Sequence, residues 1–170
     1  MKKIIREILN CISKIKKEDY LLVENLIKKH KRIFIYGTGR SGLIGRCFCM
    51  RLFHLGFNSY FVGDITTPRF TKKDILILIS SSGEKSTCLE YARICKKEKG
   101  KLLLITSNKN SELAKMADFL IDIPIKNSIQ FGSSLFEQVC FLFFDFFIQF
   151  YIEKNKVKKE LMKKRHTNLE

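Results

Sequence analysis

The run Asp74-Ile-Leu-Ile-Leu-Ile79 constrains the fold most, because its five consecutive aliphatic residues leave neither face of a strand polar. A strand that is apolar on both faces is typical of a parallel sheet covered by helices on each side. The run ends in Ser80-Ser-Ser-Gly-Glu84, and a helical pattern follows to about Lys99. The sequence therefore predicts an α/β fold built around this strand.

The same alternation of strand and helix continues along the chain. Strands are predicted at 32–36, 58–62, 101–106 and 119–123, and helices at 41–55, 112–116 and 133–153. Ser41 is a favourable N-cap residue, so the helix at 41–55 is expected to begin there. This order predicts a five-stranded, mostly parallel sheet with helices on both faces.

Length and composition favour a single domain. The chain has 170 residues, of which 45% are hydrophobic, with 2 prolines and 9 glycines, so it can bury a core within one domain. Residues 1–30 have helical spacing with a polar break near 17–19, and the chain ends in a charged tail with some helical character. We expect an N-terminal helical segment at 1–30, the main domain at 31–153 and a tail at 154–170.

The cysteines and the N-terminus indicate a cytoplasmic protein. The six cysteines form no CxxC pair, and the three histidines are not spaced to complete a metal site. Free buried thiols in a reducing compartment are therefore expected, with no metal. The N-terminal residues carry charges every few positions, unlike a signal peptide.

The net charge of +15 raises the question of an anionic partner. Lysines are spread over many segments, and Lys far outnumbers Arg, the residue favoured for reading bases. Solvated lysine faces are the favoured interpretation, followed by attraction of anionic metabolites, and we expect no nucleic-acid partner.

The segment 139–152 is apolar almost all round. It is shorter than the roughly 20 residues of a membrane span, and Asp145 lies in its middle. A helix of this kind is better buried between the sheet and another subunit. We therefore expect a homo-oligomer and no membrane.

Two loops follow predicted strands at the edge where open α/β sheets bind ligands. Gly37-Thr-Gly-Arg-Ser-Gly42 has the GxGxxG spacing of a dinucleotide site, with Asp64 22 residues after Gly42. The second loop, Ser80–Thr87, combines hydroxyls, Lys85 and a helix start, which suits a phosphate. A serine-rich turn with an N-cap is its structural alternative.

Glu137, His54 and His166 are further candidates whose surroundings also have a purely structural interpretation. Ser134 and Glu137 have capping-box spacing, and a carboxylate there also suits a base that takes a proton from carbon. His54 stands among apolar neighbours as a partly buried histidine would, and His166 lies in the tail.

Beyond these patterns, three motifs look familiar: the Gly-x-Gly-Arg-Ser-Gly loop, Met50-Arg-Leu-Phe-His-Leu-Gly56, and the terminal Arg165-His-Thr-Asn-Leu-Glu170. With them, about residues 30–170 resemble the sugar isomerase (SIS) domain, and more narrowly the 6-phospho-3-hexuloisomerase family. The resemblance implies a flavodoxin-like three-layer sandwich, usually a tetramer, without metal, nucleotide or other cofactor. It implies interconversion of D-arabino-3-hexulose 6-phosphate and D-fructose 6-phosphate, a step of formaldehyde fixation by the ribulose monophosphate pathway.

The resemblance also suggests roles for residues. Glu137 would be the base, and His54, or His166 from a neighbouring subunit, would polarise the carbonyl or help to open the ring. The substrate contacts would be Gly39, Arg40, Ser41, Ser80, Ser81, Ser82, Gly83, Glu84 and Lys85. Two positions depart from the usual Ser-Gly-Ser-Gly-Glu-Thr loop: Ser81 replaces a glycine and Lys85 a threonine.

Three alternatives remain. Another SIS-domain ketose or aldose phosphate isomerase, or a sugar-phosphate sensor without chemistry, would keep the phosphate loop. An NAD-binding module would use the glycine loop and Asp64. A basic nucleic-acid binder would use the lysines.

Overall fold

The aliphatic run forms strand β3 (Ile75–Ile79), all five residues of which are buried. In the computed structural model, which describes residues 1–125 and 127–169, β3 is the middle strand of a five-stranded sheet ordered β2-β1-β3-β4-β5. The other strands are β1 (Ile33–Gly37), β2 (Ser59–Phe61), β4 (Lys101–Thr106) and β5 (Phe119–Asp122). All neighbouring strands pair in parallel, which confirms the predicted sheet. From β1 the chain first adds β2 on one side and then β3, β4 and β5 on the other side, so the order of the strands changes side between β1 and β3.

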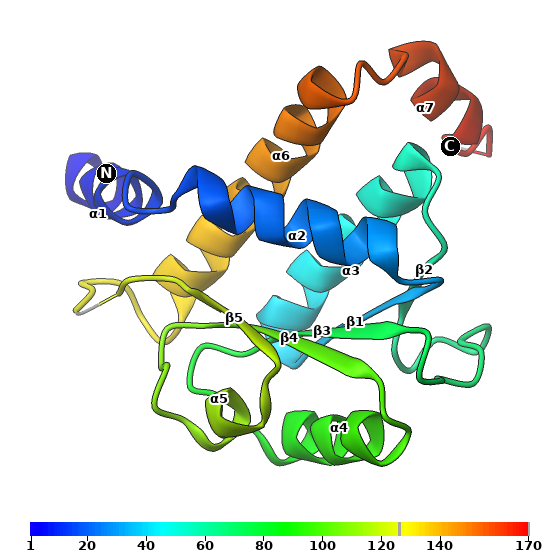
Figure 1. Ribbon diagram of the computed structural model, residues 1–170. Coiled ribbons are helices and arrows are strands. Elements are labelled where there is room, and N and C mark those ends of the chain that lie inside the picture. The colour runs from blue at the N-terminus through cyan, green and yellow to red at the C-terminus, as the bar shows by residue number, and fades with distance from the viewer. Residues whose placement is uncertain (126, 170) are drawn as a thin grey trace.

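Helices cover both faces of the sheet, as Figure 1 shows. One face carries α4 (Ser86–Lys97) and α5 (Glu112–Met116), and the other carries α1 (Lys2–Ile12), α2 (Lys17–Lys29), α3 (Gly39–Leu55) and α6 (Ser134–Lys154). Alternate residues of each strand point to opposite faces. Leu76 and Leu78 pack under α4, whereas Ile75 and Ile77 pack under α3 and α6. The molecule is a three-layer α/β sandwich, as expected.

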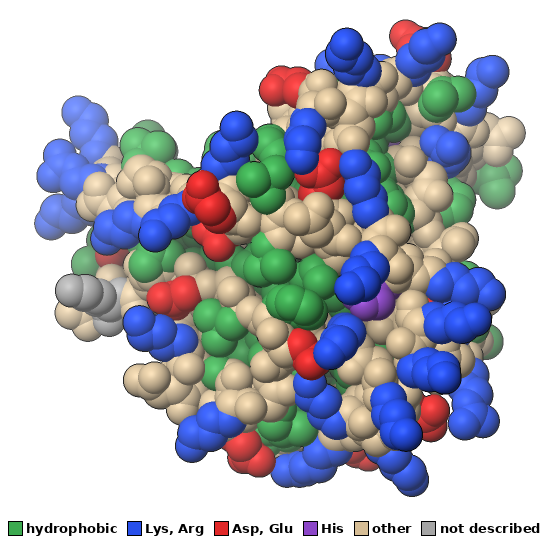
Figure 2. All heavy atoms as spheres, viewed as in Figure 1, with side chains coloured by type: hydrophobic (Ala, Val, Ile, Leu, Met, Phe, Trp, Pro, Cys, Tyr) green, Lys and Arg blue, Asp and Glu red, His purple; other side chains and the backbone are tan. Residues whose placement is uncertain are grey.

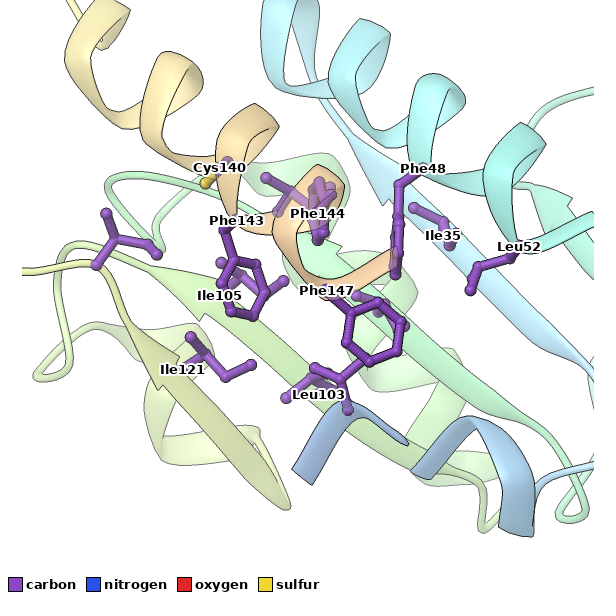
Figure 3. Packing of buried hydrophobic residues seen from close by; sticks show 14 of the residues in the cluster. Ile35, Phe48, Leu52, Leu103, Ile105, Ile121, Cys140, Phe143, Phe144 and Phe147 are labelled. Carbon is purple, nitrogen blue, oxygen red and sulfur yellow. The ribbon is translucent and has the colours of Figure 1, made fainter. Parts of the chain in front are cut away.

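The core on the α6 face is rich in phenylalanine (Figure 3). Phe48 of α3 stacks on Phe144 of α6 with ring centroids 4.1 Å apart, and Phe143 and Phe147 of α6 are fully buried above the sheet. α6 is long and apolar enough to cross a membrane by length and composition alone, but more than half of its most apolar stretch is buried inside this fold. It is therefore the core helix of the sandwich.

The N-terminal helices differ from the expected pattern in where they separate. The break lies at 13–16, not at 17–19, because α2 begins at Lys17. The side chain of Asp19 accepts the Lys16 N–H at 2.9 Å, so the charged residues of the expected break form the first turn of α2.

α2 is tied to the end of α6 by an ionic cluster around Glu24, which is 1% exposed. Its carboxylate lies 2.5 Å from Lys154 Nζ and 2.7 Å from Lys28 Nζ, and it accepts a hydrogen bond from Asn155 Nδ2 at 2.9 Å. Burial alone would raise the pKa of Glu24, but these three hydrogen bonds lower it to about 2. The carboxylate is thus charged and fully paired.

The C-terminal tail folds back onto α3. After α6, the chain forms α7 (Lys159–Arg165), which packs near the end of α3 in Figure 1. Arg165 Nη1 donates to the His54 carbonyl at 3.2 Å, so the tail supplies a cap for the last turn of α3. The final residue of the motif noted above, Glu170, lies outside the described residues.

Candidate active site

Three segments far apart in the sequence meet beyond the carboxyl ends of β1 and β3. They are the loop from β1 into α3, the loop from β3 into α4, and the segment that leads into α6. Together they line a cavity of about 530 Å³. Because the strand order changes side between β1 and β3, this is the position at which an open α/β sheet provides a ligand site.

Most of the residues that the sequence nominated for substrate contact line this cavity. They are Gly39, Arg40, Ser41, Ser80, Ser81, Ser82 and Lys85, and Glu137 lines it as well. Thr38, Phe131, Gly132, Ser133 and Ser134 complete the wall. Thr38 is the variable residue inside the glycine motif, so its position was available in the sequence; residues 131–133 carried no signal.

The N-termini of α3, α4 and α6 all face the cavity, through Thr38, Lys85 and Ser133 at their N-cap positions. Among the described residues, none of these three N-caps makes a side-chain cap hydrogen bond, whereas Ser111 caps α5 in this way. First-turn N–H groups without a cap are donors for an anion, and the helix dipoles add partial positive charge. The cavity therefore suits a phosphate.

α3 begins two residues earlier than expected. Ser41 is not the N-cap; it lies within the first turn, after Gly39 and Arg40, and is 7% exposed. Gly39 has a φ of +55°, which allows the chain to turn from β1 directly into the helix. This earlier start directs both Arg40 and Ser41 at the cavity.

The serine loop is held from behind by the end of β4. Ser81 Oγ lies 2.9 Å from Ser107 Oγ, and the Ser81 carbonyl accepts hydrogen bonds from Thr106 Oγ1 and Ser107 Oγ. The backbone of Ser81 does not have a positive φ. A serine at this position is therefore compatible with the loop, and its side chain adds an anchor that a glycine would lack.

Gly83 and Glu84 are turned away from the cavity, unlike the rest of the nominated loop. A Cβ on Gly83 would lie 2.0 Å from Ser111 Oγ, so this residue is packed tightly against the start of α5. Glu84 Oε1 accepts the backbone N–H of Glu112 at 2.9 Å. Both residues join the serine loop to α5, and their contact with substrate is not supported by this geometry.

Glu137 is 8% exposed and faces Arg40 across the cavity wall. Arg40 Nε lies 2.5 Å from Glu137 Oε2, with the arginine side chain 63% exposed. The contact is an ion pair without hydrogen-bond alignment, since Oε2 has no hydrogen-bond partner among the described residues. The result is a buried carboxylate paired with a largely exposed arginine.

The capping box considered for Ser134 and Glu137 is not formed. Ser133, not Ser134, is the N-cap of α6, and Ser134 Oγ donates to the Phe131 carbonyl at 2.8 Å. Glu137 lies one position beyond the place that a capping box requires, and its carboxylate pairs with Arg40 instead. Its side chain is therefore available to the cavity.

The Arg40–Glu137 pair also borders a second, mostly apolar groove of about 410 Å³. Ile8 of α1, Ile44 of α3, and Gln138, Phe141 and Leu142 of α6 complete its lining. Gln138 Oε1 is buried there and has no hydrogen-bond partner among the described residues.

The two histidines lie elsewhere in the chain. The rings of His54 and His166 are 5.1 Å apart, and they line a separate cavity of about 580 Å³ with Arg51, Lys163 and residues of the tail. His54 stands near the end of α3 and Ser41 near its start, about 20 Å apart along a helix that rises 1.5 Å per residue. The histidines and Glu137 therefore do not meet within one chain.

The dinucleotide pattern has a structural explanation. A Cβ on Gly42 would lie 2.4 Å from the Gly37 carbonyl oxygen, so α3 and β1 approach too closely for any side chain. Asp64 is engaged by Arg46, with Nη1 and Oδ1 2.7 Å apart. The glycine spacing thus serves helix–strand packing, and the acidic residue already has a partner.

A search for metal ligands found no group of three or more His, Cys, Asp or Glu side chains within residues 1–125 and 127–169. The cavity instead holds hydroxyls, two cations, one carboxylate and helix N-termini. These groups can bind a phosphorylated polyol and move a proton at carbon.

Comparison with known proteins agrees with this chemistry. The SIS domain family matches residues 26–142. The 3-hexulose-6-phosphate isomerase of Methanocaldococcus jannaschii is 41% identical over 150 residues, covering 87% of this chain and 82% of that protein. The 3-hexulose-6-phosphate isomerase of Bacillus subtilis is 36% identical over 177 residues, covering 98% and 95%.

A solved structure extends the similarity to three dimensions. It is a Methanococcus jannaschii protein whose crystal structure was taken to infer a molecular function of 3-hexulose-6-phosphate isomerase. Its TM-score to this chain is 0.90 at 36% sequence identity, and the match covers 99% of this chain and 98% of that one.

Proposed function

The chain belongs to the SIS domain family, and from that premise we propose that it is a 3-hexulose-6-phosphate isomerase. It would interconvert D-arabino-3-hexulose 6-phosphate and D-fructose 6-phosphate. The proposal rests on one observation: the buried carboxylate of Glu137 lines the same cavity as three helix N-termini that suit a phosphate.

The phosphate is assigned to the serine loop. Ser80, Ser82 and Lys85 line the cavity at the start of α4, whose N-terminal N–H groups point the same way. A lysine at this position adds a charge-assisted contact to those of the hydroxyls and the backbone. Anchoring the phosphate here leaves the sugar carbons to extend towards Glu137 on the opposite wall.

The reaction removes a proton from one carbon of the substrate and adds a proton to the neighbouring carbon. Starting from the 3-ketose, Glu137 takes the proton from C2, the C–H electron pair forms the C2–C3 double bond, and the π pair of the C3 carbonyl moves onto its oxygen to give an enediolate. The carboxylic acid then returns the proton to C3, while the proton on the C2 oxygen passes to the C3 oxygen. The carbonyl has moved to C2 with no oxidant or reductant, and one base on one face of the substrate suffices.

Arg40 is assigned to the developing oxygen charge. Its guanidinium is beside the carboxylate that acts as base and is largely exposed to the cavity. As the proton leaves carbon, negative charge passes from the carboxylate to the substrate oxygens, and a cation at this place stabilises both distributions.

The same site is proposed to work within a homo-oligomer, and a tetramer is the expected form. Apolar side chains are exposed on the helices beside the cavity: Ile4, Ile5 and Leu9 on α1, Leu43, Met50 and Phe53 on α3, and Phe141 and Phe146 on α6. Leu43 and Met50 are seven residues apart and share one face of α3. A second copy covering these faces would bury them.

His54 and His166 are proposed to act only across such an interface. Within one chain they lie at the opposite end of α3 from Glu137, so their assistance to the base requires the cavity of a neighbouring subunit. The proposed setting is the cytoplasm, in formaldehyde fixation by the ribulose monophosphate pathway.

The test is to incubate the protein with fructose 6-phosphate in D₂O and to follow the sugar by NMR. Two observations would support the proposal: formation of the 3-ketose, and incorporation of deuterium at C3 of the remaining fructose 6-phosphate. Deuterium at C1 identifies an aldose–ketose isomerase of the same fold instead. Binding of fructose 6-phosphate with no new sugar phosphate formed points to a sensor.

A further inference from the structure

α1 is joined to the segment that forms the third wall of the cavity. Glu7, a half-buried residue on α1, accepts the Ile129 N–H through Oε1 at 2.9 Å. Its Oε2 accepts Ser128 Oγ at 3.1 Å and Gln130 Nε2 at 3.4 Å. One carboxylate thus binds three consecutive residues that are more than 120 positions away in the sequence.

Two further contacts fix the same segment. Ser128 Oγ accepts the Gln130 N–H at 3.0 Å, which shapes the turn that Glu7 binds. Upstream, Cys11 Sγ donates to the Pro124 carbonyl at 3.6 Å, so α1 holds the chain there as well. α1 lies before residue 26, where the match to the SIS domain family begins.

The bound segment leads directly into the site. Phe131 follows Gln130, and its carbonyl accepts both the N–H and the Oγ of Ser134. Residues 131–134 line the cavity, and Glu137 follows in the first turns of α6. The position of this wall therefore depends on where the 128–130 turn is held.

In the described part of the chain, residues 127–130 are exposed or only partly buried. Ile129 is 66% exposed and Phe131 is 96% exposed, so burial of apolar side chains contributes little to its placement. Hydrogen bonds to an ionised carboxylate are stronger than neutral ones and fix geometry at both oxygens. Glu7 accepts such bonds from the turn through both of its oxygens.

We propose that Glu7 is a positioning residue of the active site: through Ser128, Ile129 and Gln130 it places the wall formed by residues 131–134 and the start of α6 that carries Glu137. The inference rests on the proposed isomerase function for its kinetic consequence. Its structural consequence, the ordering of the turn, is independent of that function.

The test compares Glu7→Ala with Glu7→Gln in the full-length protein. Glu7→Ala should lower kcat about tenfold with KM changed less than threefold, since the phosphate is bound by other loops and a misplaced base slows the chemical step. Glu7→Gln keeps the side-chain length and an acceptor for the Ile129 N–H, so it should recover most of kcat. Glu18→Ala, at an exposed carboxylate on α2, is the matched control and should behave as wild type.

Hydrogen exchange supplies the readout that does not need activity. In Glu7→Ala the amides of Ile129 and Gln130 should exchange at least tenfold faster than in wild type, while those of β3 keep their rate. Wild-type kinetics in Glu7→Ala would overturn the inference, and so would equal acceleration of exchange throughout the chain, which indicates general destabilisation. If the wild-type protein does not isomerise the hexulose phosphate, the proposed function fails, while the exchange comparison still tests the placement of the turn.

Discussion

Arg40 and Glu137 are brought within 2.5 Å of each other by two helices that begin at the same cavity, α3 and α6. Glu137 is nearly buried, whereas Arg40 is mostly exposed. A buried carboxylate and an exposed guanidinium therefore meet at the wall of one cavity, where an entering substrate can contact both groups.

Replacing Glu137 by Gln removes the proposed base and keeps the shape of the side chain. Turnover should fall by about 10²–10⁴-fold, the usual contribution of general acid–base catalysis, with the circular dichroism spectrum unchanged. The measurement is the initial rate of hexulose phosphate conversion. Glu153→Gln, on the exposed end of the same helix, is the matched control; near-native turnover of Glu137→Gln would refute the assignment.

Replacing Arg40 by Met should lower kcat about 10²-fold, because a cation beside the developing oxyanion is lost. Addition of guanidinium chloride at millimolar concentrations should restore part of the rate. Arg46 on the same helix, paired with Asp64 and outside the cavity lining, provides the control variant Arg46→Met. Equal losses in the two variants would mean that Arg40 acts only on stability.

Lys85 stands in the phosphate loop at the position where the usual loop has a threonine. Lys85→Thr should raise KM for the sugar phosphate about tenfold with little change in kcat, since a charged hydrogen bond contributes about 1.5–3 kcal/mol. The difference between the two proteins should shrink as salt is added, because screening weakens the lysine's attraction for phosphate. Lys97→Thr, at the exposed far end of α4, should leave KM unchanged.

Acid should destabilise the protein through Glu24. Its pKa is about 2 in the folded state, below its ordinary value of 4.5. The stabilisation is therefore fully present above about pH 4.5 and is lost as the pH falls towards 2. Over this difference in pKa it amounts to about 3 kcal/mol.

The measurement is the free energy of unfolding by urea between pH 6 and pH 2.5. The wild-type curve should fall more steeply than that of Glu24→Gln, which has no carboxylate to protonate. Glu90→Gln, at an exposed residue of α4, should follow the wild-type curve. Parallel curves for wild type and Glu24→Gln would contradict the prediction.

The sheet was predictable because each strand carries its own signal. Ile75–Ile79 is apolar on both faces, and the parallel order follows from strand–helix alternation. The glycine and serine loops could be placed together for the same reason, since the carboxyl ends of β1 and β3 are neighbours in any such sheet.

The third wall could not be predicted from local patterns. Residues 131–133 have no periodicity, and their position depends on Glu7, far away in the sequence. The spacing of Ser134 and Glu137 fits a capping box that does not form. The helix starts one residue earlier than that pattern requires, and the Glu137 carboxylate pairs with Arg40. The separation of His54 from Glu137 likewise follows from the length of α3, not from any motif.

The lysines show no single concentrated site in the view of Figure 2, where Lys and Arg side chains are spread over the whole visible face. Such a distribution agrees with the interpretation of solvated faces. The two cations that matter to the proposed reaction, Arg40 and Lys85, are distinguished by the cavity that they line and not by the overall charge.

The span that matches the SIS domain family ends at Leu142, part-way along α6. Phe143, Phe144 and Phe147 all lie beyond it, as α1 lies before it. A fragment cut to these boundaries would keep every cavity residue from Thr38 to Glu137, yet lose three of the core phenylalanines that pack α6 on α3 and the sheet. The span of the family match is thus shorter than the span that builds this core, and an engineered chimera should take its junctions from the second.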